Sequence, residues 1–259
     1  MTGARDSDDA EAAVDVLIVG GGPAGLAAAT FTARGGLSTL VADRGDSILR
    51  RNAHLENFPG FPAGVDARLL LSLMAEQAER AGAECAPAEV VELRVADDAA
   101  SEAGFVAETA AGDSIRTRYA ICATKNEVGY LDGIDGVTLV DQGKTFVETD
   151  GRSRTGVPGL YAAGRLAGKP HQAVVSAGHG AEAAVTLLED ADVPFYHDWV
   201  APEGYFTGRD RDVPPGCEEI DDGERADRVR ESMGVVRERS DELHPEEPVQ
   251  HPSVAGEDD

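Results

Sequence analysis

A chain of 259 residues with 48 acidic and 23 basic side chains carries a formal net charge of −25 at pH 7. This charge argues against nucleic acid and anionic membranes as partners, because both attract basic surfaces. The length suffices for one large α/β domain or two small ones. The N-terminus is too acidic for a secretory signal and no apolar run reaches membrane-spanning length, so we expect a soluble, cytoplasmic protein.

Lysine is rare, and acidic residues are spread along the whole chain. The three lysines are Lys125, Lys144 and Lys169, so nearly all basic side chains are arginines. This composition is typical of proteins from halophiles that accumulate salt, in which carboxylates keep the surface hydrated. An acidic interaction tail is the alternative interpretation, and it fits only the C-terminal part of the chain. The prediction of a halophilic protein concerns habitat rather than function.

The three cysteines, Cys85, Cys122 and Cys217, lie far apart and form no C-x-x-C pair. Their separation argues against a disulfide framework or a zinc site, and we expect no metal site. Cys122 lies within an apolar stretch, where a small core side chain is expected rather than a reactive thiol.

The first part of the chain predicts a strand, a glycine turn, a helix and a second strand. Residues 14–20 are a short apolar run rich in β-branched side chains, and the turn GGGPAG follows. The alanine-rich residues 26–34 suit a helix packed closely on a sheet. Residues 38–43 read as a second strand that ends at Asp43. Together these elements make a βαβ unit.

The middle of the chain adds further helices and strands. Apolar residues at helical spacing predict a helix over residues 67–82. Short connections predict that the next three strands form an antiparallel meander, at residues 88–95, 104–109 and 114–123. The remaining predicted elements are strands at residues 144–149 and 160–164 and a helix from Gln172 to about Leu188. The fold class is therefore α/β, a Rossmann-like domain with a central parallel sheet, helices and a three-stranded antiparallel meander.

Composition divides the chain into four parts. Residues 1–13 are an acidic N-terminus that we expect to be disordered, and residues 14–190 form a single nucleotide-binding domain. Residues 191–243 form a C-terminal extension with an aromatic segment and a short helix that carries Ala226, Val229, Met233 and Val236 on one side. Residues 244–259 are an acidic, proline-containing tail that we also expect to be disordered.

The strongest chemical motif is the first glycine turn. Gly20, Gly22 and Gly25 form G-x-G-x-x-G between a strand and a helix, as in a site where a helix N-terminus faces a pyrophosphate. Asp43 ends the following strand, where a carboxylate accepts hydrogen bonds from ribose hydroxyls and disfavours a 2′-phosphate. The unit predicts an adenosine of the FAD or NAD type, and a purely structural glycine turn is the alternative.

Several further motifs follow one another along the chain. They are GGGPAGLAAA at 20–29, ENFPGFP at 56–62, the meander running into ICAT at 121–124, and TGVPGLYAAG at 155–164 followed by HQAVVSAGHGAEAA. In this order they resemble the FAD-binding domain of the thioredoxin reductase family, over about residues 14–190. The resemblance implies that FAD is the cofactor. It also implies that the first glycine loop holds the ADP part and the second glycine-rich segment holds the ribitol and the isoalloxazine.

The resemblance implies cofactor contacts by position. Those at the pyrophosphate region would be Gly20, Gly22, Pro23, Ala24 and Gly25. Those at the adenosine would be Asp43 and Arg44, and Thr124 would lie close to the phosphates. Those at the ribitol and the flavin ring would be Gly164, Arg165, His171, Gln172 and Ala173. A backbone N–H near Ala173, at a helix start, would stabilise negative charge on the reduced ring.

Two substitutions depart from the family inside this implied site. Lys125 stands where the family has glycine, and Arg165 stands where it has aspartate. A guanidinium cannot accept the hydrogen bond that the aspartate accepts from a ribitol hydroxyl. In one interpretation both cations donate to the pyrophosphate; in the other, the chain has weakened or lost FAD. The first loop and the His171–Gln172–Ala173 segment favour retained binding.

The family's NADPH-binding domain and its redox-active C-x-x-C have no counterpart in the sequence. The segment from Lys125 to Lys144 is too short for a nucleotide-binding βαβ fold, which needs roughly 30 residues or more.

Other polar and aromatic residues are candidates for contacts around the cofactor. His54 and the neighbouring residues 50–52 occupy the stretch where the family approaches the flavin from the other side, although solvated loop residues need no such role. His197 could belong to a cover over the ring or to a dimer contact, whereas Trp199 suits buried packing.

The first functional hypothesis is a single-domain FAD-dependent oxidoreductase that passes electrons through FAD from a directly docking donor to an unknown acceptor. Free NAD(P)H, a thiol and an electron-carrier protein remain open as donors, a small molecule or a protein as acceptor, and a homodimer as assembly. The alternative is a non-catalytic or partner-dependent FAD-binding subunit. A third hypothesis, a relative of the thiazole synthases, lacks their glycine- and methionine-rich segment. Catalytic residues remain unassigned.

Overall fold

The central sheet is built around β1 (Ala12–Val19). The computed structural model describes residues 12–96, 104–195, 197–251 and 253. Within these residues, β1 pairs in parallel with β2 (Thr39–Ala42) and β6 (Ser114–Cys122), and β2 pairs in parallel with β3 (Glu84–Ala86). The strand begins two residues before the predicted start at 14.

The other side of the sheet is antiparallel. β6 pairs with β5 (Phe105–Thr109), and β5 pairs with β4 (Val90–Val95), so the predicted meander is confirmed. The second half of β6 pairs in parallel with β9 (Leu160–Ala162). The sheet order is β3-β2-β1-β6-β5-β4 with β9 beside β6, which confirms a Rossmann-like α/β fold.

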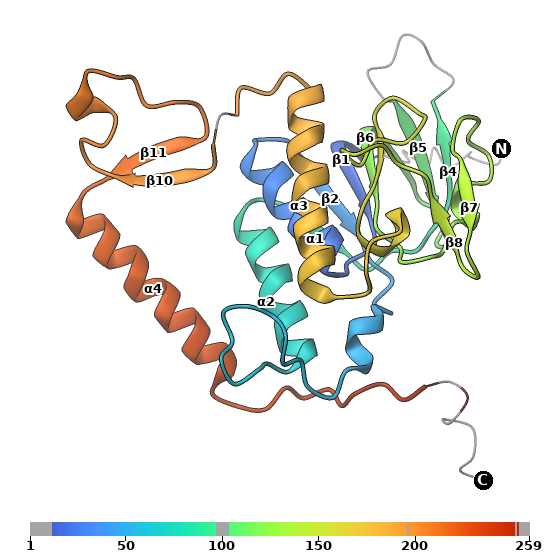
Figure 1. Ribbon diagram of the computed structural model, residues 1–259, viewed down its shortest axis with the longest axis horizontal. Helices are drawn as coiled ribbons and strands as arrows, with labels where there is room; N and C mark the ends of the chain where they lie inside the picture. Colours follow the sequence, from blue (N-terminus) through green and yellow to red (C-terminus); the bar gives the residue numbers. More distant parts are fainter. Residues whose placement is uncertain (1–11, 97–103, 196, 252, 254–259) are drawn as a thin grey trace, which may run out of the picture.

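Both faces of β1 are covered, as expected for a central parallel strand. Successive side chains point to opposite faces. Val16 and Ile18 join the buried cluster under the helices, whereas Leu17 and Val19 join the cluster on the meander side. Figure 1 shows α1 (Pro23–Arg34), α2 (Ala67–Arg80) and α3 (Ala173–Asp190) together beside the sheet.

The predicted helices and strands of this part lie close to their expected positions. α2 ends at Arg80, and Gly82 follows with a φ of +105°. The strand predicted at residues 144–149 is β8 (Thr145–Val147), and it pairs with β7 (Leu139–Asp141), a short strand that was not predicted. The short 3-10 helices among the described residues are η1 (Ile48–Arg51), η2 (Gly129–Leu131), η3 (Gly164–Ala167) and η4 (Thr207–Arg209).

A C-terminal arm, residues 197–240, projects from the domain (Figure 1). It contains β10 (Trp199–Pro202) paired in parallel with β11 (Cys217–Ile220), followed by α4 (Asp222–Ser240). The rings of Trp199, Tyr205 and Phe206 pack edge to face against one another. No described residue of α4 is buried, so the predicted apolar side of this helix faces solvent.

Charged contacts join the arm and the tail to the domain. Arg34 pairs with Asp198, Arg80 pairs with Glu231 at 2.9 Å, and Arg239 pairs with Glu76 at 2.8 Å. The tail beyond the arm passes η1, where Glu246 pairs with Arg50 and the Val249 N–H donates to the Arg50 carbonyl. Among the described residues, none of the helices is both long and apolar enough to cross a membrane.

Candidate functional site

A pocket of about 680 Å³ opens at the carboxyl ends of β1, β2 and β6. Ligands of doubly wound α/β folds bind at this edge of the sheet. The volume lies within the range of about 300–1,000 Å³ that is usual for ligand sites. Its walls come from the first glycine loop, the end of β2 with η1, the loop after η1, the end of β6, Arg165 and the start of α3.

The first glycine loop forms one wall through close backbone packing. Gly20 has a φ of +108°, a conformation that favours glycine, and a Cβ on Gly25 would overlap the Gly20 carbonyl oxygen. A Cβ on Gly21 would overlap the Asp43 side chain, so Asp43 lies directly against the loop. α1 begins with Pro23, and Gly22 at its N-cap offers no side-chain oxygen. The first N–H groups of α1 are therefore available to an anion in the pocket.

The second glycine-rich segment lies against the same loop. Gly164 has a φ of +63° and leaves no room for a Cβ beside Ala24. A Cβ on Gly180, in α3, would overlap the Ala24 carbonyl oxygen, so α3 crosses α1 in close contact. The N-cap of α3, Gln172, makes no side-chain capping bond and instead accepts a hydrogen bond from Asn57 at 2.8 Å. Two helix N-termini therefore meet in one pocket.

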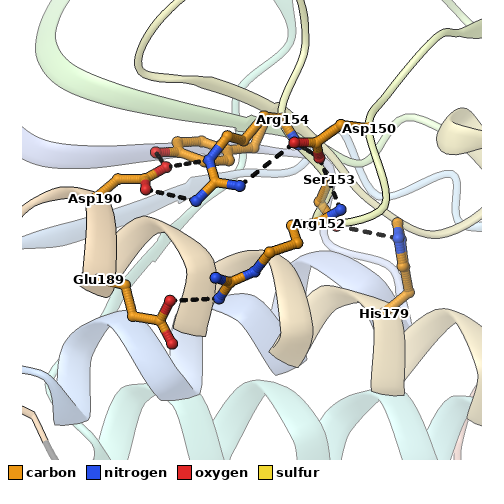
Figure 2. Close-up of polar contacts among 8 residues, drawn as sticks. Asp150, Arg152, Ser153, Arg154, His179, Glu189 and Asp190 are labelled. Carbon is orange, nitrogen blue, oxygen red and sulfur yellow. Dashed lines mark hydrogen bonds and ion pairs between the residues drawn. The ribbon is translucent and has the colours of Figure 1, made fainter.

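A buried histidine positions this second segment, and sequence analysis did not identify it. The Nδ1 atom of His179 accepts a hydrogen bond from the Gly164 N–H at 3.0 Å. The proton must then lie on Nε2, which donates to Ser153 Oγ at 3.0 Å (Figure 2). Burial lowers the pKa of His179, and Lys169 lowers it further. The neutral ring thus fixes the backbone just before Arg165.

Ion pairs hold the Ser153 loop on the last turn of α3, as Figure 2 shows. Arg154 forms two hydrogen bonds to Asp190, at 2.6 and 2.7 Å, and Arg152 pairs with Glu189. The Tyr161 hydroxyl also donates to Asp190, at 2.9 Å. The pKa of Asp190 is lowered, chiefly by the Arg154 hydrogen bonds. These contacts hold the Ser153 loop against α3, and the residues that make them do not line the pocket.

One end of the pocket is acidic, and its carboxylates are paired with an arginine. Arg44 contacts three carboxylates, those of Asp46, Glu89 at 3.1 Å and Glu127 at 2.7 Å. These pairs raise the pKa of Arg44, with the Asp46 hydrogen bond as the largest cause. Arg44 therefore lies where the resemblance implies the adenosine, but its guanidinium is already bound by protein groups.

The opposite end of the pocket is basic. Arg51, Lys125, Arg165 and His171 line it. Lys125 has a φ of +67°, the left-handed conformation that a glycine adopts more easily. Burial lowers the pKa of Lys125, and the neighbouring cations Lys144, Arg51 and Arg165 lower it further. Burial likewise lowers the pKa of His171, followed by Arg165 and Lys125. An anion at this end would relieve the repulsion.

The structure brings the implied cofactor residues together in this pocket, with two exceptions. Gly25 and Gly164 lie behind the lining, where they allow close packing. The lining includes His54, Arg51 and Asn52, but Arg50 points to the tail. Their roles toward a bound cofactor stay predictions.

The remaining sequence candidates lie elsewhere. His197 and Trp199 belong to the arm and do not line the pocket, and Trp199 is 39% exposed rather than buried. Cys122 is a core residue as predicted, and burial raises its pKa to about 12. No group of three or more His, Cys, Asp or Glu side chains suited to a metal ion occurs in the described ranges.

Several lining residues escaped the sequence analysis. Tyr130 donates a hydrogen bond to Thr124 Oγ1 at 3.0 Å, because the Thr124 hydroxyl proton goes to the Glu127 carbonyl. Ser176 lies one turn into α3, and Asn57 fixes Gln172. The only sequence signal for these residues is that Asn57 belongs to the ENFPGFP motif.

Comparison with known proteins supports a dinucleotide-binding class. The FAD binding domain family matches residues 15–53. The thioredoxin reductase of Streptomyces coelicolor is 40% identical over 116 residues, which are 44% of this chain and 34% of that protein. The thioredoxin reductase of Aquifex aeolicus is 44% identical over 79 residues, 30% of this chain and 24% of that protein. The chain thus spans about a third or less of these relatives' length.

Solved structures agree on the fold. A thioredoxin reductase from Gloeobacter violaceus matches with a TM-score of 0.59 at 20% identity, covering 70% of this chain and 96% of that one. The T. acidophilum thioredoxin reductase also gives a TM-score of 0.59 at 20% identity, covering 70% and 100%.

The class is therefore a Rossmann-like dinucleotide-binding domain. More particularly, the chain contains a FAD-binding domain, and it is similar to thioredoxin reductases over part of their length.

The residues present fit FAD. Close contacts at glycines, which any Cβ would block, keep the starts of α1 and α3 at the pocket. Asp43 lies against the loop at the start of α1. The pocket also continues past the phosphate loop to the start of α3, so it offers lining at both ends for an extended cofactor. Arg165 and Lys125 add positive charge to this site rather than closing it.

Proposed function

We propose that this protein is an FAD-dependent oxidoreductase that takes electrons from a donor docking directly at the pocket and passes them to a separate acceptor. Bound FAD would supply the redox chemistry, and the chain supplies binding, orientation and electrostatics. NADPH and thioredoxin, suggested by the relatives' names, are the first donor and acceptor to test.

The observation that carries the proposal is the meeting of two helix N-termini in one pocket. The α1 start suits the diphosphate, and the α3 start suits negative charge at the other end of the cofactor. Gly180 against Ala24 sets the distance between these two helices, and His179 fixes the turn that carries Arg165. A protein that bound only a mononucleotide would have no use for the second site.

One observation favours a second candidate, a FAD-binding subunit that acts only with a partner protein. The arm exposes Trp199, Tyr205, Val229 and Met233, and α4 buries no described residue in the domain. Such a surface suits a protein contact.

Absorption spectroscopy tests the proposal. The protein is purified without added flavin, titrated with FAD, and then treated anaerobically with NADH, NADPH and a dithiol in turn. We expect about one FAD per chain and bleaching by one of these donors. Bound flavin that none of them bleaches would favour the subunit, and a protein that FAD cannot reconstitute would overturn the proposal.

A matched pair of variants ties the flavin to this pocket. Gly25→Ala places a Cβ on the Gly20 carbonyl oxygen, whereas Gly133→Ala meets nothing within 4 Å. We expect Gly25→Ala to lose FAD binding and Gly133→Ala to keep it. Equal FAD affinity in both variants would contradict the assignment of this loop.

A further inference from the structure

The basic end of the pocket is unusual in so acidic a chain. Two of the three lysines, Lys125 and Lys144, belong to one cluster of cations with Arg51 and Arg165. Arg51, Lys125 and Arg165 line the pocket itself, and Lys144, from the β7–β8 hairpin, lies close enough to lower the pKa of Lys125. Four cations therefore lie together in a protein whose net charge is strongly negative.

These cations lack carboxylate partners, whereas most other arginines have one. In the described part of the chain, Arg51, Lys125 and Arg165 form no ion pair and no side-chain hydrogen bond. Arg44, at the other end of the same pocket, contacts three carboxylates. Glu127 attracts Lys125 electrostatically, but its carboxylate is already bonded to Arg44. The cluster is therefore free to bind an anion.

The placement of the cluster costs stability unless an anion is bound. Lys125 and Arg165 are half-buried, so they have lost part of their hydration, and like charges near each other repel. Arg51 and Lys144 are exposed. The cluster thus includes both half-buried and exposed cations, so an anion can reach it from solvent.

The diphosphate of FAD does not account for the whole cluster. Each phosphate of a dinucleotide linkage carries a single negative charge, and the start of α1 already offers N–H groups and a positive dipole end to it. Surplus positive charge remains at the end where Arg165 and His171 lie. Several cations around one point suit a multiply charged phosphate better than a single carboxylate.

We propose that Arg51, Lys125 and Arg165 form a phosphate-binding subsite for a phosphorylated co-substrate beside FAD. This inference rests on the proposed function and names the substrate class of the same pocket. The subsite would hold the co-substrate by its phosphate while the reacting part lies at the cofactor.

Calorimetric titration of the FAD-loaded protein with inorganic pyrophosphate tests the subsite, at constant ionic strength set with chloride. The variants are Lys125→Gln and Arg51→Gln, and the matched control is Arg237→Gln on exposed α4. We expect the loaded protein to bind pyrophosphate and each pocket variant to weaken it about tenfold, as for the loss of one charge-assisted hydrogen bond. The control should bind as the parent does.

The FAD affinity of the same variants separates the sources of phosphate. If the cations serve only the cofactor's diphosphate, the variants lose FAD, the loaded parent binds no pyrophosphate, and the subsite is overturned. If pyrophosphate binding falls while FAD affinity changes less than about threefold, the subsite stands.

Failure of the proposed function gives a different result. A parent that takes no FAD would end the oxidoreductase proposal, and pyrophosphate would then be titrated into the cofactor-free protein. Binding that Lys125→Gln and Arg51→Gln abolish and Arg237→Gln preserves would keep the phosphate site. Absence of such binding would overturn it.

Discussion

Different interactions stabilise the FAD-binding domain and the C-terminal arm. In the domain, α1 and α3 cross in close contact over the sheet, and Leu187 of α3 is fully buried in the same cluster as Ala28 of α1 and Val16 of β1. In the arm, Ala201, Phe206 and Ile220 are buried, but α4 is attached through exposed ion pairs such as Arg80–Glu231. Apolar burial stabilises far more than exposed ion pairs do.

The motifs that resemble the thioredoxin reductase family extend to Ala184 in α3, and the buried clusters of the domain end nearby, at Leu187. We therefore expect the arm to add a surface to a domain that does not depend on it for stability. Substitutions matched between the two regions test this conclusion.

Truncation of one aliphatic side chain in each kind of environment gives the largest expected contrast. Leu187→Ala leaves a cavity in a fully buried site and should lower the free energy of unfolding by about 2–5 kcal/mol. Val229→Ala, on α4, removes a side chain that is 47% exposed and should change it by less than about 0.5 kcal/mol. Chemical denaturation followed by circular dichroism measures both, and equal losses would contradict a stable domain with a dispensable arm.

Two helix glycines should respond to alanine with opposite signs. Gly180→Ala forces a Cβ onto the Ala24 carbonyl oxygen and should destabilise the domain by about 1–3 kcal/mol while weakening FAD binding. Gly234→Ala meets nothing within 4 Å in α4 and should stabilise that helix by about 0.5–1 kcal/mol. Thermal melts with and without FAD measure the two effects. A stabilising Gly180→Ala would mean that α1 and α3 are not in close contact.

His179 should make the stability of the domain depend on pH. Burial holds its folded-state pKa below 6.5, so the unfolded chain binds more protons between these two pKa values. The stabilisation is complete above pH 6.5 and is lost as the pH falls through 6.5 toward the folded-state pKa. Asp150 and Asp190, whose pKa values are lowered from 3.8, lose their contribution only at lower pH.

His179→Phe should remove this pH dependence. The variant also leaves the Gly164 N–H and Ser153 Oγ without their partner, which should cost about 1–3 kcal/mol at pH 7.5. His251→Phe, in the exposed tail, is the control. Urea denaturation between pH 7.5 and 5 measures both variants, and an unchanged pH profile in His179→Phe would remove His179 from this role.

The smallest expected effect concerns the attachment of the arm. Arg80→Gln removes contacts to Glu76 and Glu231, whereas the control Arg225→Gln removes a pair within α4. Trypsin should cleave α4 faster in Arg80→Gln, with the melting temperature of the domain unchanged. Salt should also speed this cleavage by screening the pairs, yet raise the melting temperature by screening the repulsion of a −25 chain. Cleavage rates are normalised to a peptide substrate at each salt concentration.

The sequence by itself determined the parts of this protein that depend on neighbouring residues. The glycines at positions 20, 22 and 25, the strand before them and Asp43 after them specify a phosphate loop, because backbone conformation and helix starts are local properties. The antiparallel meander follows from the short connections between its strands.

Only the tertiary structure decided which distant side chains meet. Arg51, Lys125 and Arg165 come from separate segments of the chain but line the same pocket. Among the described residues they have no ion-pair partner, because Arg44 binds the nearby carboxylates. In the sequence, His179 is a polar residue in a helix of small residues. Only the fold places it beside Ser153 and Gly164. The sequence also did not reveal that α4 is exposed. An apolar stripe on a helix indicates a face that is usually covered, but it does not show whether the same chain covers it.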